Sequence, residues 1–349
     1  MPRRVRLAAG VLAAVLALAA CGGGGGGGSK KATSSAPVTL RLGYFPNLTH
    51  ATALVGVANG TFARDLGSNV TLKTSTFNAG PAAVEAIFSG ALDATYVGPN
   101  PAINAFQKSN GQAIRIIAGA TSGGAALVVK PTITSAADLK GKKLASPQLG
   151  NTQDVALRSW LKKQGLNTTP EGGGDVSIVP QENAQTLETF KSGQIDGAWV
   201  PEPWTSRLVL EGKGKVLVDE ATLWPNKRFL TTTLIVRTAF LEQHPDVVQN
   251  LLKAHVEATD YVNRNPAQAQ QLANTAIAQI TGKALSAATV TAAWKNLEFT
   301  WDPLGSTLRK EASDAEAAGL LKPVNLNAIV DVGPLNAVLK AEGKATVHS

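Results

Sequence analysis

The sequence has very few of the side chains on which covalent and metal-assisted catalysis depends. Its 349 residues include one cysteine, Cys21, and four histidines, His50, His244, His255 and His348. A single cysteine excludes an intramolecular disulfide, so the stability of the fold must come from its core. The motifs HExxH, GxSxG and GxxxxGK[ST] are absent, and with them the signatures of zinc peptidases, serine hydrolases and P-loop nucleotide binding. We therefore expect no catalytic residue, no metal site and no cofactor.

Clusters of positive charge interleaved with aromatic residues are also absent. The formal net charge of +8 comes from 33 Lys and Arg against 25 Asp and Glu, spread along the chain. Nucleic acid is therefore not an expected partner. The hydrophobic content of 44% is ordinary for a globular protein, and a length of 349 residues favours two domains over one.

The N-terminus has the features of a secretion signal. A basic region, residues 3–6, precedes an apolar stretch, residues 7–20, that is too short to span a membrane comfortably. The stretch ends in Leu-Ala-Ala-Cys, the pattern of a bacterial lipoprotein signal, and this resemblance implies cleavage before Cys21 and a diacylglycerol on its thiol. The alternative is an incidental cysteine in a plain signal peptide or anchor helix.

Glycine and serine dominate the segment after this cysteine, as they do in flexible linkers. We assign residues 1–20 to a signal peptide and residues 21–37 to a flexible tether. These assignments predict an extracytoplasmic protein that is anchored by lipid to the cell membrane.

One segment of the sequence is repeated. SGALDATYVGPNP, residues 89–101, returns 103 positions later as SGQIDGAWVPEPW, residues 192–204, and both copies are typical of a strand that enters a loop. Strand and helix patterns before each copy follow the same order, starting at residues 38–44 and 143–146. Strands that alternate with helices predict parallel sheets covered on both faces. We therefore expect two equivalent units of α/β structure.

Two short β-branched segments, residues 123–131 and 231–238, fit neither unit. We interpret them as paired strands that link two lobes, followed by an almost wholly helical C-terminal part. Lobe 1 would comprise residues 38–130 and 232–349, and lobe 2 would comprise residues 131–231. Two crossings between lobes predict a hinge with a cleft beside it.

The loops after the predicted strands are rich in Asn, Gln, Thr and Gly and poor in Lys and Arg. Ligands of open α/β sheets gather at the carboxyl ends of the strands, where helix N-termini present free N–H groups. A neutral lining of this kind suits an anion held by dipoles and hydrogen bonds rather than by ion pairs. For each loop alone, ordinary turn and cap residues are the alternative, but both units show the same bias. The loops are residues 46–50, 77–80, 98–101, 147–153, 180–183 and 201–204.

Several single residues have two interpretations. Asp93 and Asp196 occupy equivalent strand starts, where a structural turn or cap role is favoured over ligand contact. For Glu202, capping of the following helix is favoured over ligand contact. Trp199 and Trp204 either line a pocket for an apolar tail or belong to the core.

These motifs resemble a known family. The lipoprotein-type N-terminus, LRLGYFPNLTHATALVGVANGTFARDLG, the repeated pair and SAADLKGKKLASPQLGNTQD are similar to solute-binding proteins of ABC importers, and most of all to the aliphatic sulfonate/taurine/nitrate group. The likeness covers roughly residues 38–320. It implies an α/β, two-lobed type II periplasmic-binding-protein fold with two hinge crossings and a helical C-terminal part. Such a protein closes on its ligand and delivers it to a membrane permease.

The resemblance also implies which residues hold the ligand. The family binds an oxyanion through loop N–H groups and through hydroxyl or amide side chains, with His50 here as a further donor. Neither the FPNLTH loop nor the PQLGNTQ loop contains arginine, so no bidentate guanidinium would secure the anion. The residues carried over are Asn47, Thr49, His50, Gly80, Gly98, Asn100, Ser122, Gly123, Gln148, Gly150, Asn151, Thr152, Trp199 and Glu202.

The leading hypothesis from the sequence is a monomeric binding protein, not an enzyme, that captures an aliphatic sulfonate for an ABC importer. Nitrate, taurine or a thiamine-precursor pyrimidine are alternative ligands. An enzyme acting on thiamine precursors with the same fold is a different class of protein, and a surface adhesin or sensory domain without transport is a third.

Overall fold

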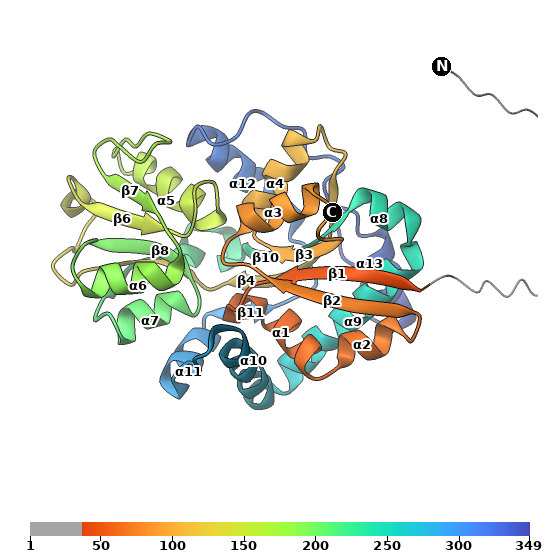
Figure 1. Cartoon of the computed structure of the whole chain (residues 1–349). Helices are drawn as coiled ribbons and strands as arrows, with labels where there is room; N and C mark the ends of the chain where they lie inside the picture. Colours follow the sequence, from red (N-terminus) through yellow and green to blue (C-terminus); the bar gives the residue numbers. More distant parts are fainter. Residues whose placement is uncertain (1–36) are drawn as a thin grey trace, which may run out of the picture. The chain divides into compact units, whose positions relative to one another are not determined.

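The computed structural model describes residues 37–349, so the predicted signal peptide, Cys21 and nearly all of the tether lie outside the described residues. Two mixed sheets with helices around them make up this part of the chain (Figure 1). The first sheet has the strand order β11-β4-β10-β3-β1-β2, and the second has the order β7-β6-β8-β5-β9. The strands are β1 (Val38–Tyr44), β2 (Val70–Thr76), β3 (Ala94–Val97), β4 (Ile114–Gly123), β5 (Ala125–Val129), β6 (Lys143–Ser146), β7 (Ser177–Pro180), β8 (Gly197–Pro201), β9 (Lys215–Asp219), β10 (Leu230–Arg237) and β11 (Leu297–Phe299).

Helices cover both faces of the first sheet, because its strands are apolar on both sides. In β10, Leu234 and Val236 enter one core cluster and Ile235 enters the other, as the two-residue period of a strand requires. One face packs against α1, α2, α9, α10 and α13, and the other against α3, α4 and α12. These helices are α1 (Ala51–Ala58), α2 (Thr61–Leu66), α3 (Gly80–Phe88), α4 (Pro99–Lys108), α9 (Pro245–Arg264), α10 (Pro266–Thr281), α12 (Gly305–Ala317) and α13 (Gly333–Ala341).

The second sheet is built in the same way. Leu127 and Trp199 face a core shared with α5, whereas Val128 and Val200 face a core shared with α6 and α7. The remaining helices are α5 (Thr152–Lys163), α6 (Asn183–Lys191), α7 (Trp204–Leu210), α8 (Thr238–Gln243) and α11 (Ala287–Trp294), and the short 3-10 turns are η1 (Leu48–His50), η2 (Ala137–Leu139), η3 (Glu220–Leu223) and η4 (Pro225–Lys227). Within residues 37–349, no helix has the length and apolar character needed to cross a membrane.

The repeat in the sequence corresponds to a repeat in the strand register. In the first sheet Leu42 pairs with Ala94, and in the second Leu144 pairs with Gly197, which lies 103 positions after Ala94. The aspartates before these strands have the same structural role. Asp93 accepts a hydrogen bond from the N–H of Arg41 at 2.9 Å, and Asp196 accepts one from the N–H of Lys143 at 2.9 Å. The predicted structural role of both aspartates is confirmed.

The crossing segments do not pair with each other, so that prediction was wrong. β5 is antiparallel to β8 and β9 in the second sheet, and β10 is antiparallel to β3 and β4 in the first. The sheets are therefore mixed rather than parallel. Inside a sheet each segment satisfies its backbone on two sides, whereas a pair outside the sheets would leave one edge of each strand without a partner.

Several element bounds also differ from the prediction. The apolar periodicity of residues 51–67 predicts one helix, but the structure divides it into α1 and α2 at Gly60, whose positive φ of 78° a continuous helix does not accommodate. The sequence pattern also predicts helices over residues 102–110 and 155–165; the corresponding α4 and α5 begin three residues earlier, which brings their N-termini to the end of the sheets. The sequence pattern did not predict the strands β4, β9 and β11 or the helix α13, and it gave no bounds for α7.

Candidate ligand-binding site

Loops that follow strands of both sheets enclose a small cavity of about 20 Å³, which we call the inner cavity. Its lining carries no Asp, Glu, Lys or Arg among the described residues. The space is enough for about one water molecule or a compact polar group. The lining residues are Phe45, Asn47, Thr49, His50, Asn78, Ala79, Gly98, Pro147, Asn151, Thr152, Gln153, Asn183, Pro201 and Thr231.

Four helices begin at the inner cavity, two from each sheet. Ala79 and Gly98 are the N-caps of α3 and α4, Asn151 is the N-cap of α5, and Asn183 is the first residue of α6. The first N–H groups of a helix have no intrahelical acceptor, and the helix dipole places partial positive charge there. The positive ends of four helix dipoles converge here and favour a bound anion, although prolines in the first turns of α3 and α4 reduce the number of N–H donors that these two helices supply.

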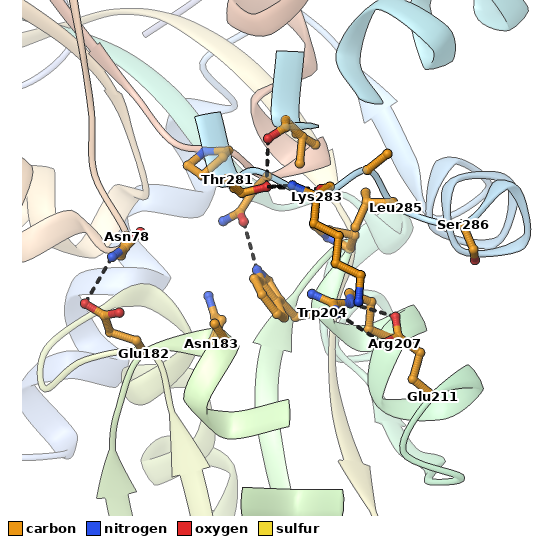
Figure 2. Close-up of a pocket in the computed structure, with 16 residues that line it drawn as sticks. Asn78, Glu182, Asn183, Trp204, Arg207, Glu211, Thr281, Lys283, Leu285 and Ser286 are labelled. Atoms are coloured by element: carbon orange, nitrogen blue, oxygen red, sulfur yellow. Dashed lines mark hydrogen bonds and ion pairs between the residues drawn. The ribbon is translucent and has the colours of Figure 1, made fainter. Parts of the chain in front are cut away.

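Two buried polar side chains on this lining lack a partner within residues 37–349. Thr152 is 1% exposed and its Oγ1 makes no hydrogen bond; Asn183 is 6% exposed and its Oδ1 makes none. Figure 2, a close-up of the larger neighbouring cavity described below, shows the amide nitrogen of Asn183 pointing into that cavity. A Cβ at Gly98 would overlap Thr152 Oγ1, so glycine is what allows this close approach. Buried hydroxyl groups are normally paired, so the Thr152 hydroxyl is available to a ligand.

His50 contributes a neutral ring. Its Nδ1 accepts a hydrogen bond from the N–H of Phe45 at 3.3 Å, and the two rings stack with centroids 4.3 Å apart. Burial lowers the pKa of His50 to about 3. The ring is therefore uncharged at neutral pH, and with Nδ1 as acceptor its proton lies on Nε2. Nε2–H is then a donor at the cavity.

A larger cavity of about 530 Å³, the outer chamber, adjoins the inner cavity (Figure 2). Asn47, Asn78 and Asn183 line both. The outer chamber thus offers space for a substituent on a group held in the inner cavity. Its other lining residues are Pro46, Glu182, Ala184, Pro203, Trp204, Arg207, Glu211, Ile277, Thr281, Lys283, Ala284, Leu285 and Ser286.

The arginine of the outer chamber is already neutralised. Arg207 Nε donates to Glu211 Oε1 at 2.7 Å and its Nη2 donates to Oε2 at 3.1 Å, while the guanidinium lies 4.7 Å from the Trp204 ring (Figure 2). This bidentate pairing uses the geometry with which arginine would otherwise bind an oxyanion. While it is paired with Glu211, Arg207 is not free to bind an anion in this bidentate way.

Three hydrogen bonds join the two sides of the site. Asn78 Nδ2 donates to Glu182 Oε1 at 3.0 Å, and Trp204 Nε1 donates to Asn47 Oδ1 at 2.9 Å. Asn151 Oδ1 accepts from the N–H of Gly80 at 3.3 Å. Each bond links a loop of one sheet to a loop of the other, so separation of the loops would break them.

The structure brings together part of the site predicted from the sequence. Six of the residues carried over from the resemblance line the inner cavity: Asn47, Thr49, His50, Gly98, Asn151 and Thr152. Gly80 lies next to it, with its N–H bound by Asn151. Ligand contact by these residues stays a prediction.

Trp199 and Glu202 do not line the inner cavity. Trp199, on β8 of the second sheet, is fully buried in the core shared with α5, and its Nε1 donates to Glu220 Oε2 at 2.7 Å. Glu202 accepts from the N–H of Ser206 at 3.1 Å and from Asn296 Nδ2 at 2.7 Å, so it caps the start of α7 and ties it to the residue before β11. Burial raises the pKa of Glu202 despite these donors. Trp199 thus belongs to the core, and capping is the role that the structure gives Glu202.

The remaining residues that the resemblance implied as ligand contacts form hydrogen bonds or turns outside the inner cavity. Asn100 Nδ2 donates to the backbone carbonyl of Glu311 at 3.1 Å, and Ser122 Oγ accepts from the N–H of Phe229 at 3.3 Å. The carbonyl of Gly123 accepts from Thr231 Oγ1. Gln148 and Gly150 form the turn before α5, where the N–H of Gly150 donates to Asp154. They support the loops of the site without lining the inner cavity.

Other lining residues were missed by the sequence reasoning. Asn78 and Asn183 lie in loops that were singled out, each at or near the start of a helix, but neither residue was named. A rule based on position would have identified both: in each strand–loop–helix unit, select the first polar residue before or at the start of the helix. Thr231 gave no such signal, because it enters the site from a crossing strand.

No group of three or more His, Cys, Asp or Glu is placed to hold a metal ion within residues 37–349.

Residues 33–278 match the NMT1-like family. The taurine-binding periplasmic protein of Escherichia coli (strain K12) is 31% identical over 214 residues, which are 61% of this chain and 64% of that protein. The aligned region thus spans less than two thirds of that relative.

Two solved structures have a similar fold. The alkanesulfonate-binding protein SsuA from Xanthomonas axonopodis pv. citri, bound to MOPS, matches with a TM-score of 0.70 and 21% identity, covering 85% of this chain and 99% of that one. The periplasmic nitrate-binding protein NrtA from Synechocystis PCC 6803 matches with a TM-score of 0.71 and 16% identity, covering 88% and 89%. The predicted two-lobed periplasmic-binding fold class is confirmed by these likenesses.

Proposed function

Because the chain belongs to the NMT1-like family, we propose that it is the extracytoplasmic substrate-binding protein of an ABC importer, with an aliphatic sulfonate as its ligand. The inner cavity carries this proposal. Among residues 37–349 it combines four helix N-termini, a neutral His50 and a buried hydroxyl on Thr152 without a partner, and no charged side chain lines it. Such a lining suits a monoanion whose charge is spread over several oxygens, as in a sulfonate.

The outer chamber favours a sulfonate with an organic substituent over an inorganic anion. A sulfonate group is larger than the one water molecule that the inner cavity of about 20 Å³ admits, so the surrounding loops would have to widen to take it. Its carbon chain would then pass Asn47, Asn78 and Asn183 into a space of about 530 Å³ lined partly by Trp204 and Leu285. Nitrate or bicarbonate would leave this chamber without ligand. The relatives named for taurine and alkanesulfonates support the same ligand class.

Taurine is the second candidate, because the outer chamber also contains acidic side chains. Glu182 uses Oε1 to accept from Asn78 at 3.0 Å, and its second oxygen is free to accept from an ammonium group of the ligand. Taurine carries such an ammonium at the end opposite its sulfonate.

In the proposed cycle, the lobe built on the first sheet and the lobe built on the second sheet rotate about the segments that cross between them, after β4 and before β10. The three hydrogen bonds across the site form on closure and enclose the ligand. Opening against the permease then releases it. Lipidation of Cys21 would keep the monomeric protein at the membrane beside its permease, and we assign no enzymatic step to it.

Thermal unfolding of the full chain tests the ligand. An alkanesulfonate at about 100 times its Kd should stabilise the protein by about 2.7 kcal/mol, since it binds only the folded state. Taurine, MOPS, nitrate and bicarbonate are the comparison ligands. Stabilisation by nitrate alone would remove the sulfonate and leave a binding protein; stabilisation by none of them would contradict the function.

Thr152→Val tests the site, because it removes the hydroxyl and keeps the shape of the side chain. We expect about a tenfold loss of affinity for the sulfonate, equivalent to about 1.4 kcal/mol, measured by titration calorimetry. Thr71→Val, an exposed position on β2, is the matched control. Equal affinities of the two variants would place the ligand elsewhere.

A further inference from the structure

Two acidic side chains meet at a second interface between the helices of the two sheets. Glu311 lies on α12, and Glu220 lies in η3, directly after β9. Both line a cavity of about 170 Å³ that shares no lining residue with the inner cavity or the outer chamber. We call it the acidic cavity.

The two carboxyl groups come from opposite halves of the molecule. α12 packs into the core of the first sheet, where Leu308 and Ala312 join Ile116. Glu220 Oε2 accepts from Trp199 Nε1 on β8 of the second sheet at 2.7 Å. Any rotation of one sheet relative to the other therefore changes the surroundings of both carboxyl groups.

Within residues 37–349, neither carboxyl group forms an ion pair with a cation of its own. Glu311 is 3% exposed, and its Oε1 has no hydrogen-bond partner within residues 37–349; Glu220 is 1% exposed. The other charged groups that line the cavity are Lys163, Lys310 and Asp314, and both lysines pair with Asp314, at 2.8 and 2.6 Å. The two lysines near Glu220 and Glu311, which we call the acidic pair, are thus paired with Asp314 instead.

Burial without a dedicated cation disfavours the ionised form of both glutamates. Burial raises the pKa of Glu220 to about 7, in spite of the Trp199 donor and the nearby Lys310. Burial and the neighbouring Glu220 raise the pKa of Glu311 well above its ordinary value. In water both would be ionised at neutral pH.

We propose that the acidic pair links protonation to closure: the pair holds a proton while α12 and η3 are together, and ionises when the halves separate and water enters. The inference rests on the proposed function, because it takes the halves to open and close as those of a binding protein do. Lower pH then favours the closed form and tighter retention of the ligand. For one linked proton, the ratio of closed to open molecules changes by up to about tenfold per pH unit between about pH 5 and 7.

A distance measurement without ligand tests this directly. Spin labels at Ala82→Cys on α3 and Gln185→Cys on α6, both exposed, would report the separation of the two sides of the site in the full chain carrying Cys21→Ser. We expect the fraction with the short distance to fall as the pH rises from 5 to 8. The same distance distribution at every pH would overturn the proposal.

Substitutions test whether Glu311 and Glu220 are the groups that bind the proton. Glu311→Gln and Glu220→Gln mimic the protonated forms, so each should keep the short distance at pH 8 and weaken the pH dependence. Glu316→Gln removes an exposed carboxylate from the same helix and should behave like the unchanged chain. A pH dependence that is unchanged in both buried variants would also overturn the proposal.

Repeating the measurement with butanesulfonate separates this inference from the proposed function. Closure by butanesulfonate to the same extent at pH 5.5 and pH 8, with no response to pH in its absence, would contradict the proton link and leave the function standing. A pH response without any response to butanesulfonate, taurine or nitrate would support the link and contradict the function.

Discussion

The two copies of the repeated segment, residues 89–101 and 192–204, have the same strand register and different surroundings. Asp93 is fully buried and receives the Arg41 N–H, the Arg41 guanidinium and the Arg237 guanidinium, the last at 3.0 Å. Asp196 is partly exposed, and its carboxylate accepts from the N–H of Lys143. The repeat therefore specifies where each strand begins, while its neighbours decide how much the aspartate stabilises the protein.

The ends of the copies diverge in a way that concerns the ligand. Gly98 and Pro201 hold equivalent positions and both line the inner cavity. Three residues further on, Pro101 packs against α3, whereas Trp204 donates across the site to Asn47. The first copy thus supplies space for the ligand, and the second supplies a bond that closes the site.

The largest expected effect separates the two aspartates. Asp93→Ala removes the buried partner of two arginines that are themselves partly exposed and should cost about 2–3 kcal/mol of unfolding free energy, whereas Asp196→Ala should cost about 1 kcal/mol, both measured by urea denaturation. Equal losses would show that the comparison is wrong.

The pH dependence of the Asp93 contribution has a definite sign. Burial alone would raise the pKa of Asp93, but the hydrogen bonds from Arg41 and Arg237 outweigh it, so the folded-state pKa is lowered. The stabilisation is then present above the unfolded pKa, about 3.9, and is lost as the pH falls through the folded value. The difference between the two variants should shrink accordingly in acid.

Gly98→Ala should have the next largest effect, on binding rather than on folding. The new Cβ would overlap Thr152 Oγ1, so α4 and α5 would have to move apart at the inner cavity. We expect at least about a tenfold loss of sulfonate affinity by calorimetry. Gly173→Ala, where a Cβ meets open space and Thr169 at 3.6 Å, is the control and should bind normally. Normal binding by both variants would contradict the role of Gly98.

The smallest effect is expected for Trp204→Phe. This change removes the Nε1 donor to Asn47 and keeps an aromatic ring beside Arg207. The loss should be about 1 kcal/mol, a few-fold in affinity, seen mainly as faster ligand release in stopped-flow experiments. Trp294→Phe changes a tryptophan that packs on Phe299 outside the site and should leave release unchanged. If release from the two variants is equally fast, the bond does not close the site.

Local patterns predicted the fold well because each strand–loop–helix unit is encoded in consecutive residues. The register of β3 and β8 follows from the repeat itself. The partners of β5 and β10 could not be predicted in this way, since both strands pair with segments far along the chain. Their β-branched residues indicate strands without indicating which sheet receives them.

For the site, the loops were predictable and the side-chain directions were not. Helix starts after strands identify the loops of Thr152 and Asn183 from sequence alone. The side chain of Asn100 is directed by its hydrogen bond to the carbonyl of Glu311. The side chain of Glu202 is directed by its hydrogen bond from Asn296. These contacts come from the helical C-terminal part, whose placement no local pattern specifies.

The described part of the chain contributes no charged residue to the lining of the inner cavity, and this also bears on how a ligand would leave. An anion paired with arginine remains attracted after water enters, whereas one held by peptide and hydroxyl dipoles loses most of its attraction once the dielectric constant rises. For the part of the ligand that the inner cavity holds, retention should depend only weakly on ionic strength, because its lining within residues 37–349 presents no charged side chain for salt to screen. Separation of the loops would therefore be sufficient to unload the ligand, with no competing ion needed to displace it.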